Sequence, residues 1–163
     1  MTATISEVRA GVELVNKGLI SEQLQARLET RITKSLEFQG YFGNESETAQ
    51  QNWARRILDQ ALSYLLLNSN QEQFYGMAPL VDIGWHTFLL YTREYAEFCD
   101  KVGGRFIHHS PCDVPGVDYG SGEEMFARTV SAMRKQGIFV DEGLWVGNLC
   151  CGDGCSSGSD ACG

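Results

Sequence analysis

Apolar residues recur every three or four positions along most of this chain, the spacing of an α-helix with one buried face. The clearest run repeats every four residues and comprises Leu24, Leu28, Ile32 and Leu36. Ser21, just before this run, is suited to cap the N-terminus of a helix. Alternating apolar and polar residues never extend far enough to predict a sheet. The pattern therefore predicts an all-α fold.

Five helices are expected, near residues 5–18, 21–40, 44–67, 79–101 and 121–137. Pro79 is suited to a first helical position, and Gly103-Gly104 is a natural stop after that helix. Asn44 with Glu47, and Ser121 with Glu124, have the spacing of a capping box. The fourth helix has an apolar stripe that comprises Val81, Trp85, Phe88, Thr92, Tyr95 and Cys99. A chain of 163 residues that is 43% hydrophobic fits one globular core.

The composition changes abruptly at Gly147. Residues 147–163, GNLCCGDGCSSGSDACG, are nearly all Gly, Ser, Cys and Asp, and they offer no apolar face to bury. Such a segment does not offset its ordering entropy by packing, so we expect a helical domain over residues 1–146 and a flexible, disordered tail. The tail contains Cys150, Cys151, Cys155 and Cys162.

The charge distribution argues against nucleic acid and membrane partners. The formal net charge is −8, the isoelectric point is near 4.8, and Arg55-Arg56 is the largest basic cluster. A field of this sign repels phosphate backbones. The N-terminal residues lack the pattern of a secretory signal, and the longest apolar stretch, Tyr64–Leu67, is too short to span a bilayer. We expect a cytoplasmic protein with reduced thiols.

All three histidines lie between residues 86 and 109, close to an aspartate and two cysteines. Asp82 and His86 are four residues apart on the predicted fourth helix, so both side chains can reach one ion. Imidazole and thiolate ligands suit zinc, and two histidines with one carboxylate suit non-haem iron. The sequence therefore predicts a zinc or iron site. The alternative is that His86 and Asp82 only satisfy each other's hydrogen bonds.

The other ligand candidates follow Gly104. A turn at that glycine can bring His108-His109 back toward the start of the fourth helix. Adjacent side chains of an extended segment point to opposite sides, so only one of these two histidines is expected to be a ligand. Cys112 lies in the following loop and is the better thiol candidate. Cys99 lies on the apolar stripe and is expected to be a small buried residue.

The run from Leu80 to Pro111 contains DxxWH, TRxY, a cysteine at position 99 and GRFxHHxP. In these motifs the chain resembles the glycine-rich domain-containing protein family, and the Gly/Cys-rich tail adds to the resemblance. That family usually has Trp-His-x-His, whereas Phe88 stands at the second histidine here. The resemblance implies a site at these residues and no particular reaction.

Several functions fit these features. The first is a metal-binding helical protein with a structural or regulatory role, which a fourth ligand such as Cys112 would favour. The second is a metal-dependent enzyme, a non-haem iron oxidoreductase or a hydrolase, built on Asp82, His86 and His109. A metal-free scaffold is the third, and a precursor of a modified peptide with its core at residues 150–163 is the fourth. The sequence leaves open the choice of metal, the protein or small-molecule partner and the oligomeric state.

Overall fold

The structure is a computed structural model that describes residues 14–15, 17–69, 75–110, 115–118 and 120–147. Within these ranges all the regular secondary structure is helical and no strand is present, which confirms the all-α prediction. The elements are α2 (Glu22–Thr33), α3 (Leu36–Phe42), α4 (Glu47–Ser69), α5 (Pro79–Leu89), α6 (Thr92–Gly103), α7 (Gly122–Lys135) and the short 3₁₀-helix η1 (Glu142–Leu144). No described helix is long and apolar enough to cross a membrane.

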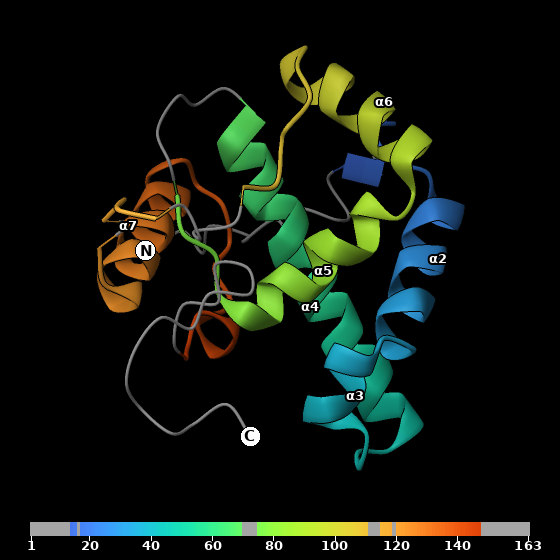
Figure 1. Ribbon diagram of the computed structural model, residues 1–163. Helices are drawn as coiled ribbons and strands as arrows, with labels where there is room; N and C mark the ends of the chain where they lie inside the picture. The colour runs from blue at the N-terminus through green and yellow to red at the C-terminus, as the bar shows by residue number, and fades with distance from the viewer. Residues whose placement is uncertain (1–13, 16, 70–74, 111–114, 119, 148–163) are drawn as a thin grey trace, which may run out of the picture.

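Helix α4 is the centre of the core. It contacts α2, α5, α6 and α7, and Figure 1 shows it passing behind α5 with α2 and α7 on either side. Every residue from Ile57 to Leu65 is buried, as expected for a helix with neighbours on all sides. At Gly84 of α5, an added Cβ would lie 2.7 Å from the Ala61 Cβ of α4. The absence of a side chain there lets the two helices approach closely.

The helix expected over residues 21–40 is two helices, so that prediction was wrong in its length. Ser21 does cap α2, because its hydroxyl accepts from the Leu24 amide at 3.0 Å. Ser35 interrupts the run and caps α3, accepting from the Phe38 amide at 3.2 Å. Leu36, the last residue of the predicted stripe, is 91% exposed, and Phe38 is buried instead. A serine hydroxyl that can satisfy backbone amides locally outweighed the continuing apolar spacing.

The helix expected over residues 79–101 is also broken, at Leu90-Tyr91. A straight helix through this region would run on for more than about 35 Å and leave the core. The break redirects the chain, and Figure 1 shows α6 running in a different direction from α5. The end of α6 then approaches α4 closely, since an added Cβ on Gly103 would clash with the Ser69 carbonyl oxygen. Thr92, expected in the buried stripe, is exposed.

Two other helix ends lie where the sequence predicts them, and a third is shifted. The Ser121 hydroxyl accepts from the Glu124 amide at 3.3 Å, and Gly104 has the left-handed conformation (φ +64°) expected of a stop. The predicted cap at Asn44 was wrong by two residues. Ser46 caps α4 instead, because its hydroxyl accepts from the Ala49 amide at 3.2 Å.

The chain after α7 is held on α4 by polar contacts. Gln60, which is fully buried, donates to the Phe139 carbonyl at 3.1 Å and accepts from the Trp145 indole at 2.8 Å. Arg56 forms a bidentate pair with Asp141, at 2.7 and 2.9 Å. The described chain is thus anchored up to Trp145. Most of the segment predicted as the first helix lies outside the described residues, as do Cys112 and the four tail cysteines.

Candidate metal centre

Two of the candidate ligands come from consecutive turns of α5. Pro79 begins the helix after Ala78, and Asp82 lies in its first turn with only 7% of its surface exposed. His86 follows one turn later, and its Nε2 is 3.3 Å from Asp82 Oδ2. The helical spacing therefore brings a carboxylate and an imidazole together.

The third ligand candidate comes from the extended segment after Gly104. This segment is fixed two residues before His109 by the hydroxyl of Tyr95, which donates to the Ile107 carbonyl at 2.6 Å. The same hydroxyl accepts from the indole Nε1 of Trp85 at 2.8 Å. Burial raises the pKa of Tyr95 far above its usual value, so the hydroxyl keeps the proton that it donates.

His109 completes the cluster. Its Nε2 is 2.9 Å from Asp82 Oδ1, and its ring lies 4.4 Å from the ring of Trp85 and 4.8 Å from that of His86, between centroids. One ligand atom from each of Asp82, His86 and His109 lies within 4.8 Å of the other two. Among the described residues, no other group of three acidic, histidine or cysteine side chains comes together in this way.

The remaining sequence candidates lie elsewhere. His108 is exposed, and its ring lies 4.9 Å from that of Phe106, outside the cluster. Cys99 is buried with 0% exposure, as expected for a core residue. Phe88 is buried as well, and its ring meets the rings of Tyr95 and Phe98. Cys112 lies outside the described residues, and the assignment of the candidates as metal ligands stays a prediction.

A second carboxylate, Glu37 of α3, also faces the cluster. Its Oε2 is 3.7 Å from Nδ1 of His86, which is within ion-pair distance although longer than a hydrogen bond. Glu37 is mostly exposed, so this contact is adjustable. The sequence did not predict this contact, because Glu37 is far from His86 in the chain and no local pattern links them.

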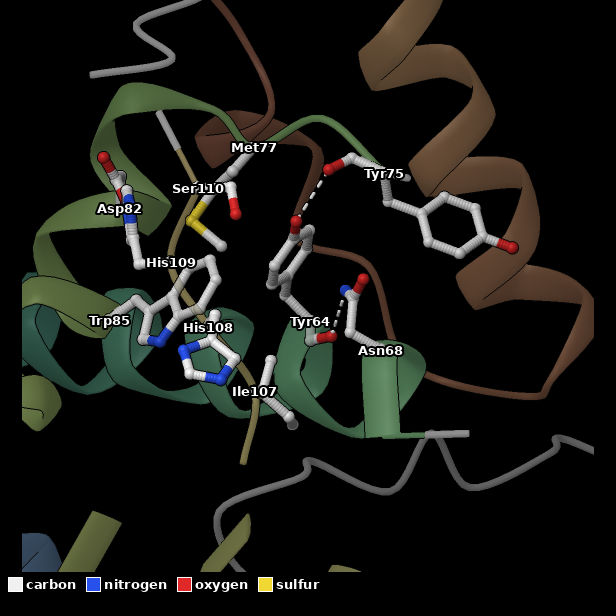
Figure 2. A pocket seen from close by; sticks show the side chains of 10 residues that line it. All are labelled: Tyr64, Asn68, Tyr75, Met77, Asp82, Trp85, Ile107, His108, His109 and Ser110. Carbon is white, nitrogen blue, oxygen red and sulfur yellow. Dashed lines mark hydrogen bonds and ion pairs between the residues drawn. The ribbon is translucent and has the colours of Figure 1, made fainter. Parts of the chain in front are cut away.

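A small cavity of about 90 Å³ adjoins the cluster (Figure 2). Figure 2 shows that its wall combines the side chains of Asp82 and His109 with aromatic and apolar side chains. Its lining comprises Tyr64, Asn68, Tyr75, Met77, Asp82, Trp85, Ile107, His108, His109 and Ser110. Tyr64 closes one side and is itself fixed, since its hydroxyl donates to the Tyr75 carbonyl at 2.6 Å.

The spacing of the cluster suits a transition metal ion. Ligand atoms about 2.0–2.2 Å from one ion lie about 2.8–3.6 Å apart, by simple tetrahedral or octahedral geometry. The two carboxylate-to-imidazole distances, 2.9 and 3.3 Å, fall in that range, although they involve different oxygens of Asp82. The three ligand atoms lie within 4.8 Å of one another, so the set would draw closer together around a bound ion. Two histidines and one carboxylate are a donor set for ferrous iron and for zinc.

The chain matches the model of one protein family. The family model described as UCP032817-like matches residues 27–132, well over half of the sequence, and the chain belongs to that family. The match extends from α2 into α7 and so includes Asp82, His86 and His109. No curated protein and no solved structure matches the chain.

This result corrects the resemblance found in the sequence. Assignment to the glycine-rich domain-containing family was wrong, because the matching family model is UCP032817-like. The motifs behind the assignment are short, and several of their residues have structural roles in the core. Trp85 and Tyr95, for example, are hydrogen-bonded to each other in the core.

Proposed function

We propose that this UCP032817-like protein binds one divalent transition metal ion, zinc or ferrous iron, through Asp82, His86 and His109. The observation that carries the proposal is that the Nε2 atoms of both histidines face the same buried carboxylate. One of them comes from the same helix and the other from a segment beyond α6.

A purely structural explanation accounts for only part of this arrangement. A buried carboxylate requires hydrogen-bond partners, and His109 at 2.9 Å is one. His86, with 41% of its side chain exposed, can instead be solvated by water. Helical spacing brings this histidine to Asp82, and a bound metal ion would give the contact a function. The ion would also give Glu37 a role, since carboxylates commonly orient the second ring nitrogen of a metal-bound histidine.

Two roles follow from the number of ligands. A fourth protein ligand, for which Cys112 is the candidate, would close the site and favour a structural or regulatory role. A site with only three protein ligands keeps positions for water and substrate. The exposure of His86 favours this open form, which makes a metal-dependent enzyme the second candidate function. Iron would then suit oxygen-dependent redox chemistry, and zinc would suit hydrolysis.

Metal content of the purified protein tests the proposal. We expect about one equivalent of zinc or iron by elemental mass spectrometry after purification without chelator. His86→Ala and His109→Ala should each lose the metal and keep a helical circular dichroism spectrum. His108→Ala is the matched control, because it removes the neighbouring histidine outside the cluster and should retain the metal.

Two outcomes contradict the proposal. A wild-type protein that stays free of metal after incubation with Zn²⁺ or with Fe²⁺ under anaerobic conditions would leave Asp82 and the histidines as a structural polar cluster. Full metal content in both His86→Ala and His109→Ala would move the site elsewhere, with the tail cysteines as the next candidates.

A further inference from the structure

The cavity beside the cluster is a candidate binding site in its own right. Asp82 and His109 contribute both to the metal cluster and to the cavity wall. A molecule in the cavity would therefore contact two of the three residues that would hold the ion. Figure 2 shows the side chains of Trp85, Met77 and Tyr64 around the same space.

The charge of the wall selects for a single negative charge. A divalent ion held by one carboxylate and two neutral imidazoles has a net charge of +1, which one monoanion neutralises. No lysine or arginine is among the described residues that line the cavity. A second negative charge on the ligand would thus find no lysine or arginine among these lining residues, which disfavours a dianion.

The size of the cavity and the polarity of its wall limit the part of the ligand beyond its charged group. Met77 and Ile107 are buried apolar residues that can contact a short alkyl group. An engineered cavity of about 150 Å³ holds benzene, and the smaller volume here, about 90 Å³, favours a ligand smaller than an aromatic ring. The exposed residues His108 and Ser110 place polar groups at its edge.

We infer that the cavity binds a short-chain monocarboxylate, with its carboxylate on the metal ion and its alkyl group against Met77 and Ile107. This inference rests on the proposed metal site. It names the class of ligand that the site accepts and explains why aromatic side chains and a thioether enclose one side of an otherwise polar cluster.

Visible absorption of the Co²⁺-loaded protein tests the inference, because Co²⁺ changes its spectrum when its ligands change. We expect a saturable change with propionate, and binding of succinate and benzoate that is weaker by about tenfold or more. Met77→Ala enlarges the cavity and should let benzoate bind. Ser110→Phe fills the edge of the cavity and should weaken propionate binding by about tenfold, with Co²⁺ content unchanged.

Ser131→Phe is the matched control, because Ser131 is an exposed residue of α7 outside the cavity lining and should leave propionate binding unchanged. Ser110 is also exposed, so its variant should fold. Co²⁺ binding with no response to propionate, or equal propionate affinity in Ser110→Phe, would overturn the inference alone. Failure to bind Co²⁺, Zn²⁺ or Fe²⁺ would overturn the metal site together with the inference.

Discussion

Two buried polar side chains, Gln60 of α4 and Asp82 of α5, each hold a distant segment of the chain against the helical core. Gln60 holds the segment after α7, and Asp82 meets the segment after α6 through His109. Both are at least nine-tenths buried. They differ in how many of their hydrogen-bonding sites the protein occupies and in whether water reaches their partners.

The amide of Gln60 is fully used by the protein. Its Nε2 donates to the Phe139 carbonyl and to Asp59 Oδ2, at 3.1 and 3.3 Å. Its Oε1 accepts from the Asp141 amide and the Trp145 indole, at 3.1 and 2.8 Å. These contacts match the two donors and two acceptor sites of the side chain, which leaves no place for a ligand.

Asp82 presents the opposite case. A carboxylate offers about four acceptor sites, and the described contacts direct two of them at histidine Nε2 atoms. One of these histidines, His86, is substantially exposed, and a cavity lies on the side of His109. A saturated polar contact fixes structure, whereas a cluster of ligand atoms beside solvent and a cavity can also accept an ion.

The largest expected effect is at Gln60. Gln60→Leu removes the hydrogen bonds to the Asp141 amide, the Trp145 indole and the Phe139 carbonyl from the core, so we expect the free energy of unfolding to fall by about 3 kcal/mol. Urea denaturation measures this change. Gln51→Leu, at an exposed position of the same helix, is the control and should change stability little. A loss below about 1 kcal/mol would show that the contacts do not anchor the segment.

Tyr95→Phe should reduce both the stability of the protein and its affinity for the metal ion. It removes the hydroxyl that joins Trp85 to Ile107, so we expect a loss of about 2 kcal/mol in unfolding free energy. Because His109 follows Ile107 closely, metal affinity should weaken by about tenfold. Competition with a coloured chelator measures the affinity. Tyr91→Phe is the control, since it also removes a tyrosine hydroxyl; unchanged affinity in Tyr95→Phe would mean that His109 is positioned independently.

A smaller effect is expected at the second anchor of the segment after α7. Arg56 pairs with Asp141 through two hydrogen bonds and stacks on Trp53 at 4.0 Å, and its bond with Asp141 raises the pKa of its guanidinium. Lysine keeps the positive charge but cannot form the two parallel hydrogen bonds of a guanidinium group. We therefore expect Arg56→Lys to lower the free energy of unfolding by about 1 kcal/mol, measured by urea denaturation. Arg55→Lys, at an exposed ion pair, is the control and should lower the free energy of unfolding measurably less. Equal losses would mean that the bidentate geometry adds nothing.

The smallest effect is expected from the tail. The composition of residues 148–163 provides no apolar face, so truncation after Gly147 should change the unfolding free energy by less than about 0.5 kcal/mol. Thermal and urea denaturation of the shortened protein measure it. A clear destabilisation would contradict the predicted boundary between a helical domain and a tail, and it would assign a structural role to the tail cysteines.

The sequence by itself determined the helical architecture and several helix ends. Apolar spacing and caps such as Ser21 and Ser121 act within one or two turns, so they can be recognised without the fold. Asp82 and His86 were paired for the same reason, since four residues on one helix bring two side chains together. The breaks at Ser35 and Leu90 were missed, because the apolar spacing continues through both.

The tertiary structure alone decided which histidine meets Asp82. The choice of His109 over His108 depends on the path of the segment after Gly104, which the Trp85–Tyr95–Ile107 hydrogen bonds fix. The contact with Glu37 and the cavity beside His109 likewise join segments that no local pattern connects. These features arise from the packing of α5 and α6 around α4, and packing depends on all the contacting side chains at once.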